Sequence, residues 1–201
     1  MFGRCLLARS ALTRLSRQSS SIALPGVPRR LADVAKMELF EAEEPSRIGT
    51  IWESFHEDKP ELAACCVPAE EHMKIVERAR ESPMFIFPVR REQGHFLLLS
   101  QFDVAHEMFV MTFLEDYKRN PAAAQPWLSV TLFSELLTSK AVGLLRADFA
   151  PERLVKREGE HVMSLVRRYY GSDNYDRVWT FNHAERHFNL DAYLSSCPDG
   201  Q

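Results

Sequence analysis

The spacing of apolar residues predicts helices in several parts of the chain. Over residues 46–56 they recur at positions i, i+3, i+4 and i+7, which places them on one face of a helix. Residues 68–82 show a second helical pattern, which opens on a proline suited to the first turn. A longer helix is predicted from Pro151 to about Tyr170, and a closing helix over 188–196. The predicted core-facing residues are Ile48, Ile51, Trp52 and Phe55 in the first helix and Met73, Val76 and Ala79 in the second.

Short apolar runs bounded by turn residues predict strands between these helices. The runs lie at 62–67, 84–87, 95–102, 107–114, 127–133, 141–149 and 177–182. Because short turns join most of them, neighbouring strands are expected to pair antiparallel. We therefore predict an α+β fold, a mainly antiparallel β-sheet with helices packed against it in a single domain.

The stretch SPMFIFPVRREQGHFLLLSQF, residues 82–102, carries apolar residues on both sides of a charged turn. After the turn, Phe96 and Leu98 point to one face of the sheet, and Leu97 and Leu99 point to the other. An antiparallel sheet often turns one face to water, and that face is then polar. The pattern therefore has two interpretations. Helices cover both faces, which we favour because large exposed apolar patches are uncommon, or one face is a docking surface.

The charged turn, Arg90-Arg91-Glu92, also has two interpretations. Its guanidinium groups can bind an anion or clamp a carboxylate. More often such a cluster is a solvated turn. A catalytic role needs a nearby base or nucleophile, and the sequence identifies none.

Charge is distributed unevenly along the chain. Residues 1–32 contain six arginines and no Asp or Glu, together with many serines and leucines. Removing these arginines from the 25 basic residues leaves 19 against 28 acids, a net charge of −9. Such an acidic body argues against nucleic acid as the main partner. The first segment has the composition of a mitochondrial transit peptide, although a disordered basic arm is the alternative. We predict a transit peptide over 1–32, with cleavage between residues 18 and 31, followed by a domain over 33–201.

Signatures of catalysis and of metal binding are mostly absent. The sequence contains no GxxxxGK[ST], GxGxxG or GxSxG motif. His183 and His187 have i, i+4 spacing, but no third metal ligand follows nearby. The four cysteines form no CxxC pair, and Cys65 lies in an apolar strand that raises the pKa of a thiol. No run of 18 apolar residues occurs, which argues against a membrane-spanning helix.

Several short motifs follow one another in order across residues 33–196. They are Ile51-Trp52, Val67-Pro68-Ala69, Ser82-Pro83 with Phe85, Pro88 with Arg91-Glu92, Gln101-Phe102, Glu135-Leu136 with Lys140, and Phe181-Asn182. This succession resembles that of the mitochondrial ATP synthase assembly factors that chaperone the beta subunit of the F1 head. The specificity lies in the order and spacing of the motifs, since none is diagnostic alone.

The resemblance implies an α+β fold, a location in the mitochondrial matrix, no cofactor and no catalysis. It implies that the chain binds the unassembled beta subunit of F1-ATPase, prevents its aggregation and hands it over for assembly with alpha subunits. We expect a monomer without a nucleic-acid partner, a small-molecule substrate or a membrane insertion. The contact surface is expected around the charged hairpin and the strand at 177–182. The candidate partner-binding residues are Phe85, Pro88, Arg90, Arg91, Glu92, Phe96, Trp179, Phe181 and Asn182.

Two other functions stay open at this point. The first is a small matrix enzyme that acts on an anionic substrate through Cys65 or the Arg90-Arg91 pair. The second is a structural subunit of a large mitochondrial complex. A ligand that raises the melting temperature would favour the enzyme, and stable co-migration with mature ATP synthase would favour the subunit.

Overall fold

The computed structural model describes residues 25–199 of the chain. Within them, six strands form one antiparallel sheet of order β1-β6-β5-β4-β3-β2, so that β1 and β2 are its edges. The α+β fold predicted from the sequence is confirmed. The strands are β1 (Leu62–Pro68), β2 (Met84–Arg91), β3 (Gly94–Asp103), β4 (Met108–Phe113), β5 (Pro126–Phe133) and β6 (Val142–Phe149).

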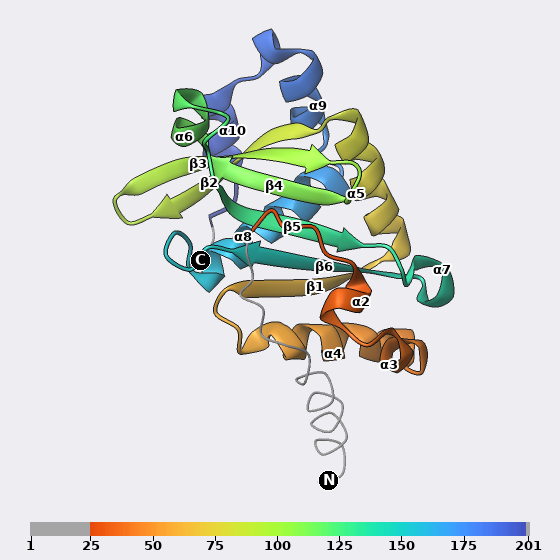
Figure 1. Ribbon diagram of the computed structural model, residues 1–201. Coiled ribbons are helices and arrows are strands. Elements are labelled where there is room, and N and C mark those ends of the chain that lie inside the picture. The colour runs from red at the N-terminus through yellow and green to blue at the C-terminus, as the bar shows by residue number, and fades with distance from the viewer. Residues whose placement is uncertain (1–24, 200–201) are drawn as a thin grey trace.

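Helices connect the strands and cover the sheet. In Figure 1, α4 lies along β1 and α8 passes behind the strands, and both helices contact β1. The helices are α2 (Leu31–Val34), α3 (Met37–Glu41), α4 (Pro45–Glu57), α5 (Ala69–Glu81), α6 (Leu114–Arg119), α7 (Leu137–Lys140), α8 (Lys156–Val166), the π-helix η1 (Arg167–Gly171), α9 (Asp176–His183), the 3-10 helix η2 (Glu185–His187) and α10 (Leu190–Ser196).

Both faces of the sheet are covered at β1, β5 and β6. Consecutive residues of a strand point to opposite faces. Leu144 packs in a cluster with Trp52 of α4, whereas its neighbour Leu145 belongs to a larger cluster that contains Val162 of α8. Helices therefore cover both faces of this half of the sheet, whereas the prediction of double coverage concerned residues 82–102, which lie in β2 and β3 in the other half.

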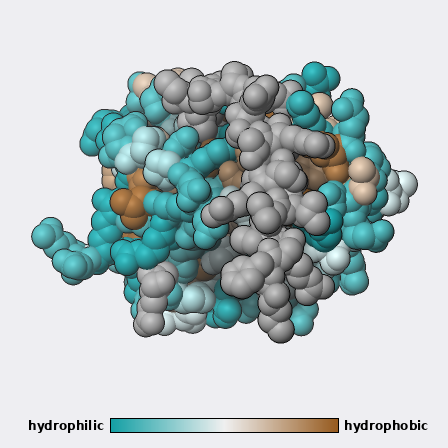
Figure 2. All heavy atoms as spheres, turned by 90° about the horizontal axis from the view of Figure 1, so that it is seen from below, coloured by the Kyte–Doolittle hydropathy of each residue, from teal (hydrophilic) through white to brown (hydrophobic). Residues whose placement is uncertain are grey.

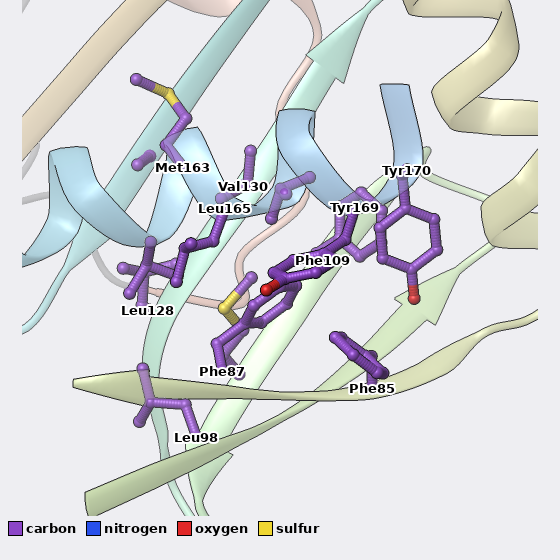
Figure 3. Close-up of a cluster of buried hydrophobic side chains, with 14 of the residues drawn as sticks. Phe85, Phe87, Leu98, Phe109, Leu128, Val130, Met163, Leu165, Tyr169 and Tyr170 are labelled. Atoms are coloured by element: carbon purple, nitrogen blue, oxygen red, sulfur yellow. The ribbon is translucent and has the colours of Figure 1, made fainter. Parts of the chain in front are cut away.

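The larger cluster packs the sheet against η1. Figure 3 shows Phe85 of β2 and Phe109 of β4 pointing toward Tyr169 and Tyr170 of η1. The ring centroids are 5.5 Å apart for Phe85 and Tyr169 and 5.0 Å apart for Phe109 and Tyr170, both in tilted geometry. Such aromatic pairs contribute about 0.5–1.5 kcal/mol beyond the area that they bury. Arg78 of α5 donates a hydrogen bond of 2.9 Å to the carbonyl of Tyr170 and holds η1 against α5.

Helix α4 follows the apolar stripe predicted for it. Ser46 was expected to be the N-cap, but the helix begins at Pro45 with Glu44 as its N-cap, since proline fits the first helical position. Ile48, Ile51 and Trp52 are buried as predicted, and Phe55 is half-buried. The stripe therefore packs on the outer face of β1 and β6.

The strand predicted at residues 177–182 is wrong, because this segment lies in helix α9. Its β-branched and aromatic residues favour a strand locally. Val178, Phe181 and Asn182, however, have i, i+3, i+4 spacing and form one helix face. That face packs on β2, where Phe181 lies 5.6 Å from Phe85 between ring centroids. Tertiary packing has overridden the local preference.

The predicted start of the long helix at Pro151 is also wrong. Helix α8 begins only at Lys156, with Val155 as its N-cap. The carboxylate of Glu158 accepts the Val155 N–H at 3.0 Å, which fixes the helix start at this position. The residues from Pro151 to Arg153 form a turn.

Side chains from α9 and α10 form hydrogen bonds with the outer edge of strand β2, which has no neighbouring strand in the described part of the chain. The Asn182 amide accepts the Met84 N–H at 3.1 Å and donates to the Met84 carbonyl at 2.6 Å, as a neighbouring strand would. The hydroxyl of Tyr193 donates to the carbonyl of Ile86 at 2.8 Å. Pro88 has no N–H to offer, which suits an edge position. This edge is closed to pairing with another strand.

Part of the predicted transit segment belongs to the folded body. Leu31 is fully buried, and its N–H donates to the carboxylate of Glu135 at 2.7 Å. Gly26 has a φ of +80°, and a Cβ there would lie 3.0 Å from Pro126. The predicted boundary at residue 33 therefore cuts through packed structure. Residues 1–24 of the predicted transit peptide lie outside the described residues.

Where its described residues are visible, the surface on the side of α3 and α4 is mostly hydrophilic (Figure 2). Figure 2 views the molecule from this side and shows only small hydrophobic patches among the described residues that are visible.

Two buried histidines predict a pH dependence of stability. Burial lowers the pKa of His56 to about 3 and that of His72 to about 4. Both are neutral in the folded protein, whereas in the unfolded chain they bind a proton near pH 6.5. The unfolded state therefore gains protons first as the pH falls, so the free energy of unfolding should fall between pH 7 and 5.5 by about 1 kcal/mol per histidine. Urea unfolding across this range measures it, and a flat profile would contradict the burial of neutral imidazoles.

Candidate functional site

The two arginines of the charged hairpin bind their own chain. Arg91 makes a bidentate ion pair with Glu158 of α8, with N···O distances of 2.7 and 2.9 Å, and donates to the Arg153 carbonyl. Burial raises the pKa of the Glu158 carboxyl, but hydrogen bonds from Arg91 and from the Val155 N–H outweigh it and hold that pKa below its ordinary value. The ion pair fixes the hairpin to α8.

Arg90 holds the C-terminal segment in a similar way. Its Nε lies 2.7 Å from the Asp199 carboxylate, and its Nη2 donates to the Leu194 carbonyl. The arginines belong to β2, and the turn between β2 and β3 consists of Glu92 and Gln93. Of the charged hairpin residues, Glu92 has no ion pair among the contacts of the described residues and is exposed.

An aromatic cluster lies beside this hairpin. Phe96 of β3 has its ring 6.0 Å from Phe113 of β4 and 5.7 Å from Trp127 of β5, and Phe113 stacks on Trp127 at 5.0 Å. Two guanidinium groups lie over these rings, Arg91 at 4.9 Å from Phe96 and Arg153 at 5.1 Å from Trp127. Such cation–π contacts contribute about 0.5–1 kcal/mol at exposed sites.

A pocket of about 660 Å³ opens next to Trp127. The N-terminal segment, the end of α6, the loop before β5 and the turn after β6 form its walls. Its charged residues are of both signs, and Arg119 and Arg153 are exposed. We call it the aromatic–arginine pocket; it is lined by Pro25, Val27, Asp116, Arg119, Asn120, Ala123, Ala124, Gln125, Pro126, Trp127, Ala150, Glu152 and Arg153. Trp and Arg are the residues most enriched at energetically dominant positions of protein interfaces.

The other candidate residues lie along β2 and α9. Phe85 and Pro88 are buried, and Phe181 and Asn182 are partly buried against β2. Trp179 is different, because 43% of it is exposed and its ring packs 5.2 Å from that of His183 on the outer side of α9. The structure therefore brings Arg91 and Phe96 to the aromatic cluster and leaves Trp179 elsewhere.

Sequence reasoning missed the residues that complete the cluster. Phe113, Trp127 and Arg153 come from β4, β5 and the turn after β6, and no local motif connects them. The available signal was a tryptophan that opens a strand after the loop NPAAAQP, next to an apolar hairpin.

The geometry offers little for catalysis. Burial raises the pKa of the Cys65 thiol to about 12, which leaves the nucleophilic thiolate essentially unpopulated at neutral pH. The Ser82 hydroxyl lies 3.1 Å from Nε2 of His183, but Ser82 is fully buried and out of reach of a substrate. Among residues 25–199, no three His, Cys, Asp or Glu side chains are placed to hold a metal ion. No helix in this part of the chain is long and apolar enough to cross a bilayer.

Comparison with known proteins gives consistent matches. The sequence model of the family described as ATP11 protein matches residues 9–194. A protein of Schizosaccharomyces pombe named "Protein atp11, mitochondrial" is 26% identical over 116 residues, 56% of this chain and 41% of its own length. A Danio rerio protein named "ATP synthase mitochondrial F1 complex assembly factor 1" is 20% identical over 168 residues, 82% of this chain and 55% of its own length. The matches thus cover about half the length of these curated relatives.

Proposed function

The chain belongs to the ATP11 protein family, and from this premise we propose that it is a chaperone of the unassembled beta subunit of mitochondrial F1-ATPase. It binds this subunit, prevents its aggregation and releases it when alpha subunits take over the same surface. The observation that carries the proposal is the family match across residues 9–194. The name of the zebrafish relative, an F1 complex assembly factor, supports it.

Such a chaperone needs a contact surface rather than a catalytic centre. It must cover an assembly face of its client with an interface that a better-packed partner can displace. The aromatic–arginine pocket and the adjoining ring of Phe96 provide apolar area with charged groups at the rim. In this proposal Glu92, Phe96 and Trp179 contact the client directly. The other candidate residues hold the hairpin and α9 in place; they are Phe85, Pro88, Arg90, Arg91, Phe181 and Asn182.

Light scattering of a refolding beta subunit tests the proposal. Isolated beta subunit is diluted from denaturant with and without an equimolar amount of the folded chain. The proposal expects the chain to suppress the scattering of beta, with isolated alpha subunit as the control client. Scattering of beta that is unchanged by the chain would overturn the proposal.

Charge reversal at the pocket rim should weaken binding of the beta subunit. Arg119 and Arg153 are exposed, so Arg119→Glu with Arg153→Glu leaves the core intact. We expect affinity for beta to fall about tenfold, mostly through slower association, as for charges at an interface rim. Surface plasmon resonance measures both rates. The matched control is Lys36→Glu with Arg168→Glu, two exposed positions elsewhere. Equal rates for the two double variants would remove the pocket from the interface.

We place the protein in the mitochondrial matrix, with a transit peptide in the first part of the chain. Residues 1–32 should carry a fused reporter protein into mitochondria. Replacement of Arg4, Arg9, Arg14 and Arg17 by glutamate should lower this import strongly. Unchanged import by that variant would remove the targeting assignment. Because Gly26 and Leu31 are packed in the folded body, we expect cleavage before residue 25. The mass of the imported full chain measures the new N-terminus.

Further features belong to the same proposal. The chain acts without catalysis or a cofactor, as a monomer, and its acidic body has no nucleic-acid partner. A stable position in mature ATP synthase would instead identify a structural subunit. Blue-native electrophoresis of mitochondria separates the two, since a chaperone leaves the complex after assembly.

A further inference from the structure

A second pocket lies at the other end of strand β5. The aromatic–arginine pocket adjoins Trp127 at the start of β5, whereas this one adjoins Ser134 just after its end. Its volume is about 460 Å³, and it lies where α5 meets β4, β5 and α7. We call it the His72 pocket; it is lined by His72, Met73, Val76, Glu77, Arg80, Glu107, Ser134 and Leu137.

His72 gives this pocket an unusual wall. The residue is 1% exposed, and neither ring nitrogen has a hydrogen-bond partner among the described residues. A Cβ on Gly143 would lie 2.4 Å from Cδ2 and 2.7 Å from Cγ of the imidazole, so this edge of the ring faces β6. Burial lowers the pKa of His72 to about 4, so the ring is neutral and offers one donor and one acceptor. Buried polar groups of native proteins are nearly always paired, so an imidazole without a hydrogen-bond partner among the described residues is unusual.

Met73 is the second unusual residue of the pocket. The helical pattern predicted it on the core face of α5 with Val76 and Ala79, but 55% of it is exposed while both of those are buried. The core-facing residue at this turn is His72 instead. Met73, Val76 and Leu137 thus form an apolar wall at the surface. Methionine adapts its shape to varied apolar partners and is frequent at binding surfaces.

The pocket continues past an ion pair into a neighbouring hollow. Arg80 and Glu107 are joined at 2.9 Å, and both line the His72 pocket and a second hollow of about 550 Å³. Ser134 lines both as well. Glu107 has a φ of +47°, a backbone conformation that non-glycine residues seldom adopt and that clusters at functional sites. The two hollows thus adjoin at these shared residues, which carry charges of both signs.

We propose that the His72 pocket binds an extended segment of the unassembled beta subunit, with a large aliphatic side chain against Met73 and a peptide group hydrogen-bonded to His72. This inference rests on the proposed function and adds a second contact for the same client. A peptide unit carries one donor and one acceptor, which matches a neutral imidazole. The mixed charges of Arg80 and Glu107 suit a polypeptide better than a ligand of one sign. Strand β5 separates the two contacts by about 24 Å from Trp127 to Ser134, so one client that reaches both gains affinity from each.

Substitution of the two wall residues tests this assignment. Met73→Asp adds a charge at an exposed position and spares the core. The matched control is Val155→Asp, since Val155 is also 55% exposed but lies on α8. His72→Leu removes both unpaired nitrogens at similar volume. Affinity of each full-length folded variant for refolding beta subunit is measured by surface plasmon resonance, and thermal unfolding is followed by circular dichroism.

We expect Met73→Asp to bind beta at least tenfold more weakly and Val155→Asp to bind like the wild type. His72→Leu should bind several-fold more weakly while its melting temperature stays equal or rises, which a merely structural histidine would not produce. Wild-type binding by Met73→Asp overturns the inference and leaves the proposed function intact, whereas failure of the wild type to bind beta overturns the proposed function first. A self-association of the wild type that Met73→Asp abolishes would assign the pocket to a second copy and also overturn the inference.

Discussion

Replacement of Trp52 by alanine should lower the free energy of unfolding by about 3–5 kcal/mol, the cost of a large-to-small change in a packed core. Trp52 is fully buried between α4 and the sheet, and its ring contacts those of Phe40 and Phe133 edge-on. Its Nε1 donates to the Leu145 carbonyl at 3.0 Å, which ties α4 to strand β6. Urea unfolding at pH 7 measures the change.

Trp179→Ala is the matched control for this experiment. The same substitution there removes a side chain that is 43% exposed on the outer side of α9. We expect its cost to stay below about 1 kcal/mol. Equal losses for the two tryptophans would contradict the packing of α4 described above.

Replacement of Arg146 by methionine should be nearly as costly, for an electrostatic reason. Arg146 and Asp148 form a buried ion pair of 2.5 Å on the face of β6 that α4 covers. Burial raises the pKa of the Asp148 carboxyl, and the Arg146 guanidinium beside it opposes this most strongly, with a smaller contribution from the charge of Arg29. Removing one partner of such a pair leaves an uncompensated charge and costs about 3–5 kcal/mol.

A double variant separates this cause from lost packing. Arg146→Met with Asp148→Val replaces the pair by apolar groups, and buried pairs are often replaced in this way at little cost. We expect the double variant to be more stable than Arg146→Met alone. A double variant as unstable as the sum of its single changes would contradict the electrostatic account, and urea unfolding of all three decides.

The sheet was predictable from the sequence because its signals are local. Strands β5 and β6 are mostly apolar runs between turn residues, and their positions follow from that pattern. Helix α9 was missed because its residues favour a strand locally, and only the packing of Phe181 on Phe85 selects the helix. Met73 was assigned to the core because it is apolar and lies next to the helix face formed by Val76 and Ala79. The sequence pattern does not show that the polar His72 is buried in its place.

The candidate site was harder to predict, since its contacts join distant residues. Arg91 pairs with Glu158, which lies 67 positions later in the chain. Nothing in the sequence indicates this ion pair, so Arg91 was predicted to contact a client. Reversing both hairpin arginines would therefore place carboxylates opposite Glu158 and Asp199 and disturb the fold. The aromatic cluster depends on which side chains of β3, β4 and β5 meet on one face of the sheet, and no local motif connects Phe96, Phe113 and Trp127.

Size-exclusion chromatography with light scattering tests the central claim most directly. Refolding beta subunit is mixed with the mature chain, the complex is isolated, and purified alpha subunit is then added. The account predicts a complex with beta but not with alpha alone, and release of the chain when alpha is added. Absence of any complex with beta, or a chain that stays bound to the assembled alpha–beta complex, would contradict it.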